Sequence, residues 1–331
     1  MYDIITFGSA TWDNFLQLKK DNYKISQENI FGGNRGLCLP LGAKVFLEDK
    51  QSKSGGGGTN SAVTFARQGF RVAYCGKIGD DIAGENILRE LKENKVDQNL
   101  CLKDKEHSTA YSAILSVPEE ERTVLIYRGA CHFLTEQDLP KEKLKRTKWF
   151  YIAPLSGDSA LVFAGILDLA RDNKIKVAAN LGNTQINLGR ERLKSLLQLV
   201  DVLILNQEEA ASLSGLSIKQ EREIILELSN LTNGLIVITK GAGGSLVVAG
   251  QDIYEAGIIS TSIIEKTGAG DAYASGFLAG LIRKNNIEYA MQLATANATG
   301  CSQQIGAKNG LLDKNDLGQW PKVIVNKKPL N

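Results

Sequence analysis

Histidine and cysteine, two residues on which many active sites depend, are scarce in this chain of 331 residues. Histidine occurs only as His107 and His132, so a catalytic centre that needs several histidines is nearly excluded, and neither residue belongs to a motif. The five cysteines are widely spaced and form no Cys-x-x-Cys pair, which leaves zinc ribbons and redox motifs without support. We expect buried free thiols in a reducing compartment.

An excess of charge of either sign and long apolar runs are absent as well. Lys and Arg number 39 against 37 Asp and Glu, a net charge of +2, which argues against a nucleic-acid binder. No apolar run approaches the roughly 18 residues of a membrane helix, and the N-terminus lacks the basic start and cleavage site of a signal peptide. We therefore expect a soluble cytoplasmic protein that binds no membrane.

Glycine is the residue in excess, with 33 of 331 positions against an average usage of about 7%. Nine of these glycines lie in three short loops, at 55–58, 241–244 and 268–270. Glycine lets a backbone approach a ligand closely, so this concentration predicts three binding loops rather than a generally loose chain.

Regular alternation of strands and helices from residue 149 onward predicts a mostly parallel sheet that is covered on both faces. The predicted strands are 4–7, 72–75, 149–153, 176–179, 202–205 and 235–239. The predicted helices are 59–69, 82–94, 159–172, 190–199, 207–213, 219–228, 269–284 and 287–304. A hairpin is expected at 245–248 and 252–255.

Two segments differ from the rest of the chain in their residue pattern. They consist of short stretches in which apolar and polar residues alternate, which is typical of a small β-sheet or flap. They are about 11–49 and 108–129, and the second contains a turn at 118–121 between two strands. The charge run Glu119–Arg122 is interpreted as a solvated turn. We expect one domain, 1–331, with this flap as a discontinuous lid and with 1–10, 50–107 and 130–331 as the core.

The glycine loops fit neither of two common phosphate-binding motifs. The one Gly-Lys pair is followed by Ile78 rather than Ser or Thr, and the 241–244 cluster precedes a predicted strand instead of a helix. The sequence Gly268-Ala269-Gly270-Asp271, by contrast, opens a predicted helix. Unpaired N–H groups at a helix start attract anions, and the aspartate is placed to take a proton from a hydroxyl. For an isolated motif, Asp271 could instead merely favour the helix dipole.

Several separate elements appear together in one order. They are Gly8-Ser9 with Asp13, then Gly55–Ala62, Asn206–Glu209, Thr239–Gly244 and Gly268–Asp271. Over nearly the whole chain this set resembles the ribokinase family, the PfkB carbohydrate kinases. The resemblance implies a three-layer α/β/α sandwich with a central, mostly parallel sheet and a small β-sheet lid. It also implies transfer of the γ-phosphoryl group of ATP to a hydroxyl of a sugar-like acceptor, with Mg²⁺ and, as a further candidate, a monovalent cation such as K⁺.

On the acceptor side, the resemblance implies that Asp13, Gly57, Gly58 and Asn60 hold substrate hydroxyls. An amide both donates and accepts hydrogen bonds, which suits a polyol. Asn60 has a second interpretation as a helix N-cap. Arg128, like Arg35, is a candidate for a substrate carboxylate or phosphate, although an exposed arginine is the commoner outcome.

On the donor side, the resemblance assigns the base to Asp271 and the anion hole to Gly268, Ala269 and Gly270. Phosphate and ribose contacts are implied at Thr239, Gly241 and Gly244. Nucleotide contacts are implied at Asn206 and Glu209, with Mg²⁺ held through water by Glu209. Asn297 is a candidate on the adenine side, with an exposed helical polar residue as the alternative.

The chain departs from the family pattern at Glu265-Lys266, where Asp-Thr is usual. The carboxylate is retained, but a cation now lies close to the anion hole. Lys266 is either a point charge for the nucleotide phosphates or a solvated surface lysine.

Two alternatives to a sugar kinase remain. The nearer is a nucleoside kinase with an adenosine- or inosine-type acceptor, in which Trp12 and Phe15 would stack on a base; these two residues could equally form flap core. The remoter is a sugar or nucleotide sensor without catalysis. Exposed flap edges are natural pairing surfaces, so we also expect a homodimer through the lid.

Overall fold

The computed structural model describes residues 1–31, 34–118, 120 and 122–330. Within them, ten strands form one sheet in the order β16-β15-β14-β13-β12-β11-β10-β1-β6-β7. From β7 to β13 neighbouring strands are parallel, whereas β14, β15 and β16 are antiparallel. The bounds are β1 Ile4–Phe7, β6 Val72–Gly79, β7 Asp97–Asp104, β10 Trp149–Ile152, β11 Lys176–Asn180, β12 Val202–Asn206, β13 Leu235–Thr239, β14 Ser245–Ala249, β15 Asp252–Ala256 and β16 Val325–Pro329.

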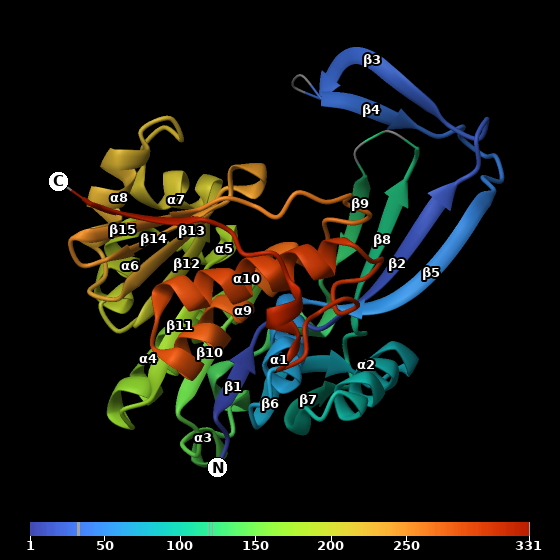
Figure 1. Cartoon of the computed structure of the whole chain (residues 1–331). Coiled ribbons are helices and arrows are strands. Elements are labelled where there is room, and N and C mark those ends of the chain that lie inside the picture. The colour runs from blue at the N-terminus through green and yellow to red at the C-terminus, as the bar shows by residue number, and fades with distance from the viewer. Residues whose placement is uncertain (32–33, 119, 121, 331) are drawn as a thin grey trace.

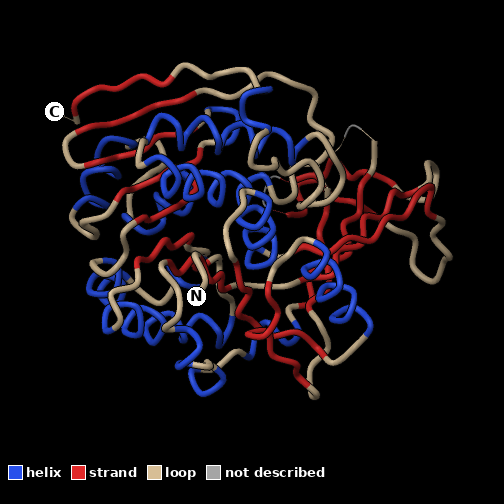
Figure 2. The backbone as a smooth tube through the Cα atoms, turned by 60° about the horizontal axis from the view of Figure 1, so that its bottom comes forward, coloured by secondary structure: helices blue, strands red, loops and turns tan. Residues whose placement is uncertain are grey.

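The central strands are nearly continuous apolar runs because both faces of the sheet are covered. Every residue of β1 is buried, for example. One face packs against α1 (Gly57–Arg67), α2 (Ile82–Glu93), α9 (Ala269–Lys284) and α10 (Ile287–Ser302). The other packs against α4 (Val162–Asp172), α6 (Arg190–Leu197), α7 (Gln207–Ser214) and α8 (Glu221–Ser229). Figure 2 shows helices on both sides of the strands, so the predicted three-layer sandwich is confirmed. The short helices are α3 Lys141–Leu144 and α5 Asn183–Ile186.

A second sheet stands over one end of the first and forms the lid (Figure 1). Its order is β5-β2-β8-β9, and a two-stranded hairpin, β3-β4, projects beyond it. The bounds are β2 Thr11–Leu18, β3 Lys24–Phe31, β4 Asn34–Cys38, β5 Leu47–Gly55, β8 Ala110–Ser116 and β9 Thr123–Tyr127. Because β5 pairs with β2 as far as Gly55 opposite Thr11, residues 50–55 belong to the lid sheet and not to the core predicted for them.

The strands that the sequence analysis missed are the two at the outer ends of the large sheet, β7 and β16. Both are polar: β7 reads Asp-Gln-Asn-Leu-Cys-Leu-Lys-Asp and β16 reads Val-Asn-Lys-Lys-Pro. Charged residues and proline are how edge strands avoid unwanted pairing. The same feature hides them from an analysis based on apolar runs.

The parallel strands all end at the edge of the sheet that lies beneath the lid. Ligands of open α/β sheets bind at this carboxyl edge, where helices also begin. Asn206 ends β12 and Thr239 ends β13 there, and α1 and α9 start close by. No helix in the described part of the chain is long and apolar enough to cross a membrane.

Candidate active site

The glycine loop before α9 has a backbone that only glycine tolerates. Gly268 is the N-cap of α9 with φ 83°, and a Cβ there would lie 2.3 Å from the Cβ of Ala307. The helix then begins at Ala269, whose N–H donates to the Lys266 carbonyl at 3.2 Å, and Asp271 lies in the first turn. This is the geometry of an anion site with a carboxylate beside it.

The first turn of α1 faces the first turn of α9. Asn60 donates its Nδ2–H to Asp271 Oδ2 at 2.9 Å, and a Cβ on Gly57 would lie 3.2 Å from Asp271 Oδ1. The interpretation of Asn60 as an N-cap is wrong, because the N-cap of α1 is Gly56. Asn60 Oδ1 is buried and has no hydrogen-bond partner within the described residues. A buried acceptor of this kind usually meets a ligand or water.

Gly58 packs closely against the end of β1. A Cβ there would lie 2.8 Å from the backbone of Gly8 and from the ring of Tyr74. Glycine is therefore needed at position 58 to let α1 pack against the end of β1.

Asp13 lies on the lid strand β2 and is 7% exposed. It accepts a hydrogen bond from Ser112 Oγ at 2.5 Å. Burial raises the pKa of the Asp13 carboxyl, and the Ser112 hydrogen bond and the charge of Lys308 oppose the rise. The sequence analysis named Asp13 but missed Ser112, because the contact spans 99 residues and Ser112 belongs to no motif.

Lys308 is a second residue of this charge cluster that the sequence analysis missed. Its side chain is 3% exposed, and its Nζ donates to Ser54 Oγ. Burial lowers the pKa of Lys308 to about 8, against the opposing charges of Glu90, Asp13 and Asp271. A single lysine in a loop carries no signal in sequence, since most lysines are solvated.

The pKa of the Asp271 carboxyl is raised, first by burial and then by the charge of Asp13. The hydrogen bond from Asn60 and the charge of Lys308 act in the opposite direction. A carboxylate with a raised pKa is a stronger base near neutral pH, which suits it to accept a proton from a hydroxyl.

A pocket of about 460 Å³ opens on the other side of the glycine loop. It contains most of the residues predicted for the donor side: Thr239, Gly241, Gly244, Lys266, Ala269 and Gly270. Its remaining wall is largely apolar and was not predicted. That wall includes Ile258, Ile259, Ile263, Tyr273, Thr295 and Ala298. An apolar slot with a few polar groups is typical of a site for a flat ring.

Asn206 and Glu209 form a capping box at the start of α7. Asn206 Oδ1 accepts from the Glu209 N–H, and Glu209 Oε2 accepts from the Asn206 N–H, both at 2.8 Å. Burial raises the pKa of Glu209, and the charges of Glu208 and Asp271 add to the rise. Across the described residues no group of three or more His, Cys, Asp or Glu could hold a metal ion. A cation here would need water and phosphate oxygens as its other ligands.

Asn297 does not have either predicted role. Its side chain is fully buried rather than exposed, and it does not line the pocket. Nδ2 donates to the Ala272 carbonyl at 2.8 Å, and Oδ1 accepts from the Leu312 N–H at 2.9 Å. Asn297 therefore fastens α10 to α9 and to the segment that follows α10.

The two candidate arginines lie away from this cluster. Arg128 is exposed where β9 ends, outside the lining of the pocket. Arg35 pairs with Glu120, which ties the β3-β4 hairpin to the lid turn. Trp12 is partly buried and packs against the core on the α1 face, while Phe15 is 8% exposed.

The prediction of a solvated turn is wrong for the side chain of Arg122, which forms an ion pair. Its Nη1 lies 2.8 Å from Glu265 Oε1, in the segment that leads to the glycine loop. Glu119 and Glu121 lie outside the described residues.

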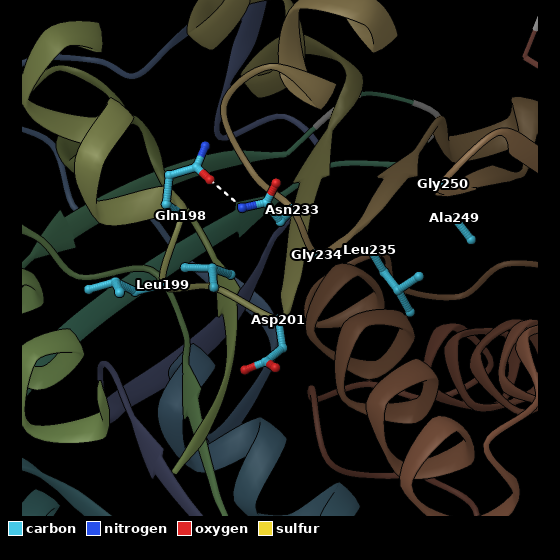
Figure 3. Close-up of a pocket in the computed structure, with 9 residues that line it drawn as sticks. Gln198, Leu199, Asp201, Asn233, Gly234, Leu235, Ala249 and Gly250 are labelled. Atoms are coloured by element: carbon cyan, nitrogen blue, oxygen red, sulfur yellow. Dashed lines mark hydrogen bonds between the residues drawn. The ribbon is translucent and has the colours of Figure 1, made fainter. Parts of the chain in front are cut away.

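Another hollow lies at the opposite edge of the sheet, where β12 and β13 begin (Figure 3). Its volume is about 420 Å³. Gln198 and Asn233 hydrogen-bond to each other across its rim, and Asp201 uses its carboxylate to accept the Val177 N–H. These polar groups already have partners, and the hollow is far from the glycine loops in the fold.

A carboxylate at a glycine-lined helix N-terminus, between buried polar groups and an apolar pocket, is the arrangement expected of a small-molecule kinase. The chain belongs to the pfkB family of carbohydrate kinases, which it matches over residues 44–315. These enzymes are phosphotransferases that act on sugar hydroxyls.

Similar proteins agree with this family. The chain is 26% identical to aminoimidazole riboside kinase of Salmonella typhimurium over 78% of this chain and 83% of that one. It is 27% identical to ribokinase of Lactococcus lactis over 82% and 86%. The structure of Arabidopsis thaliana ribokinase complexed with ribose and ATP shares the fold, with a TM-score of 0.78, 18% identity and coverage of 96% and 98%.

Proposed function

We propose that this kinase transfers the γ-phosphoryl group of ATP to a hydroxyl of a sugar or sugar-like acceptor, with Asp271 as the base. The observation that carries the proposal is the position of Asp271, in the first turn of α9 and facing the first turn of α1. On one side lie Asn60 and Asp13, and on the other the pocket lined by Gly270.

In the proposed reaction, the acceptor oxygen bonds to the γ-phosphorus while the bond from that phosphorus to the β–γ bridging oxygen breaks. Asp271 takes the hydroxyl proton, and ADP leaves with the electron pair of the broken bond. The N–H groups of the Gly268–Gly270 turn stabilise the charge on the transferring group. The lid covers the site, which protects the phosphoryl group from water.

Acceptor hydroxyls would be held by groups that are already buried and oriented. Asp13 accepts hydrogen bonds from hydroxyls, and Asn60 Oδ1 offers the acceptor that lacks a partner. Gly57 would leave the backbone at the start of α1 open to the acceptor, whereas Gly58 is buried and sets the packing of α1 on β1. A polyol matches these groups because every hydroxyl both donates and accepts.

The nucleotide would occupy the pocket beyond the glycine loop. Its base would lie against the isoleucines, and its phosphates near Thr239, Gly241, Gly244 and Lys266. Lys266 is exposed on the rim and would act as a point charge. Glu209 and Asn206 would hold Mg²⁺ through water, and Mg²⁺ would neutralise charge on the phosphates. A monovalent cation such as K⁺ and a cytoplasmic location stay predictions.

A nucleoside acceptor is the second candidate, and the riboside kinase among the similar proteins favours it. A stacking role for Trp12 has less support, because Trp12 packs against the core. A sugar or nucleotide sensor without catalysis is disfavoured, because the members of this family are phosphotransferases.

A substrate panel tests the proposal: ribose, fructose, 2-keto-3-deoxygluconate, adenosine and inosine, each with ATP and with ADP as donor. We expect ATP-dependent phosphorylation of one sugar or sugar acid, and loss of that activity in Asp271→Asn. Turnover with a nucleoside alone would replace the sugar by the second candidate. Near wild-type turnover in Asp271→Asn would remove Asp271 as the base.

A homodimer through the lid has support from the outer lid strand. β9 pairs with β8 on one side, and all five of its residues are exposed. They include Leu125 at 56% and Ile126 at 55%. An apolar edge strand is a pairing surface, so Ile126→Lys should shift the sedimentation-equilibrium mass from dimer to monomer. A wild-type monomer would contradict the dimer.

A further inference from the structure

An ion pair joins the lid to the segment that carries the anion hole. Arg122, directly before β9, places Nη1 2.8 Å from Glu265 Oε1. The two side chains are 30% and 12% exposed. Figure 1 shows the segment between β15 and α9 running from the large sheet toward β9. Partial burial makes such a pair stronger than one on an open surface.

The same carboxylate oxygen fixes the residue before the anion hole. Glu265 Oε1 accepts from the Thr267 N–H at 2.9 Å and from Thr267 Oγ1 at 2.8 Å. The next residue is Gly268, whose positive φ turns the chain into α9. Three donors therefore meet one oxygen: two belong to the loop, and one belongs to the lid.

The segment is also fastened to the core on its other side. The N–H groups of Ile264 and Glu265 both donate to the Ser302 carbonyl, at the end of α10. Glu265 is thus held between α10 and the lid. If the lid lifts, Arg122 leaves, and a mostly buried carboxylate loses its cation. The carboxylate then gains by turning toward water, which releases Thr267.

We propose that Arg122 and Glu265 are positioning residues that couple lid closure to the geometry of the anion hole. The proposal rests on the phosphoryl-transfer site at Asp271 described above. The Gly268–Gly270 N–H groups would be correctly placed only while the lid arginine is in contact. Phosphoryl transfer would then be slow whenever the lid is open and water can reach the site.

Kinetics of Arg122→Gln separate this role from a merely structural one. Anion-hole contacts act in the transition state, so we expect kcat to fall about 10-fold, in the usual range of couplings between sites, with KM for ATP little changed. Arg122→Lys should restore part of kcat. When Arg122→Gln is added to Glu265→Gln, kcat should fall little further, because Arg122 has already lost its carboxylate partner.

Hydrogen exchange provides a readout that needs no acceptor. The peptide covering residues 263–272 should exchange faster in Arg122→Gln than in the wild type. Arg190→Gln is the matched control, since it removes an arginine–glutamate pair between α6 and α8. It should change neither exchange of that peptide nor kcat.

Three results would overturn the coupling: kcat of Arg122→Gln within about twofold of the wild type, a loss confined to KM, or unchanged exchange at 263–272. A wild type that phosphorylates none of the acceptors would contradict the proposed acceptor class instead. In that case the exchange measurement still decides whether the lid arginine orders the loop.

Discussion

The two sides of Asp271 are built on different principles. The acceptor side is a cluster of buried charges, in which Asp13 is 7% and Lys308 is 3% exposed. The donor side is an open pocket with glycine backbone on one wall and isoleucines on the other. In the proposed reaction the acceptor side would therefore work through electrostatics and hydrogen bonds, and the donor side through close backbone approach and apolar contact.

This difference predicts which kinetic constants each kind of substitution changes. A change among the buried charges should alter pH dependence and acceptor binding. A change at the pocket should alter ATP binding alone. Asp271 belongs to both sides, so its substitution should have the largest effect.

Asp271→Asn should lower kcat by about 10²- to 10⁴-fold, which is the usual contribution of a general base. In the wild type, the pKa of the Asp271 carboxyl is higher in the folded than in the unfolded protein. Between these two pKa values the folded protein therefore binds more protons than the unfolded one. The charged carboxylate thus destabilises the fold above that window, and Asp271→Asn should melt at a higher temperature than the wild type at pH 7.

The gain in Tm should shrink as the pH falls toward the ordinary carboxyl range, where the wild-type group is protonated too. Calorimetry at several pH values checks this. Asp168→Asn, on the exposed face of α4, is the control and should change neither kcat nor this pH dependence. A lower Tm for Asp271→Asn at neutral pH would contradict the destabilising charge.

Gly55→Ala should damage the acceptor side next most strongly. A Cβ at position 55 would lie 1.9 Å from Asp13 Oδ2, so Asp13 must move. Displacement of a substrate-orienting group by about 1 Å typically costs roughly 10²-fold in rate. We expect that loss in kcat/KM for the acceptor, with the Kd for ATP unchanged. Gly318→Ala, which meets nothing within 4 Å, should have no effect.

Lys266→Ala should affect only the donor side. A point charge near phosphates contributes modestly when exposed, so KM for ATP should rise about 5- to 10-fold. KM for the acceptor should stay the same. Lys284→Ala, at the opposite end of α9, is the control. Unchanged KM for ATP and unchanged turnover in Lys266→Ala would assign Lys266 to the solvated surface.

Lys308→Met should give the smallest change in rate at neutral pH but a distinct pH signature. Without the lysine charge, the pKa values of Asp13 and Asp271 rise further. The acid limb of kcat/KM should therefore move to higher pH. An unmoved acid limb would show that Lys308 does not act on these carboxylates.

The direction in which Lys308→Met changes the stability of the fold depends on pH and can be predicted. The pKa of Lys308 is about 8 in the folded protein against an ordinary value of 10.5, so the unfolded chain holds more protons between these pH values. Wild-type stability should rise with pH across that window. Lys308→Met should be more stable than the wild type below pH 8, with the advantage lost as the pH approaches 10.5. Lys322→Met, at an exposed lysine, should show no such trend.

Sequence patterns predicted the fold well where strands are apolar, and failed at the two polar edge strands, β7 and β16. For the site, the sequence pointed to loops that the fold brings together. Thr239, Gly241 and Gly244 line one pocket with Ala269 and Gly270. It was wrong about Asn297, because a polar side chain in a helix can bond to buried backbone as well as face water.

The sequence by itself determined the glycine loops and the place of Asp271 at the start of α9, because each consists of neighbouring residues whose backbone conformation is local. A glycine turn at a helix start binds an anion in any fold that leaves it exposed. Only the tertiary structure decided the surroundings of that base. Ser112 joins Asp13, Lys308 joins Ser54, and Arg122 joins Glu265, across separations of up to 254 residues. Such contacts depend on how strands cross over and on where the lid sheet lies, and no local pattern encodes them.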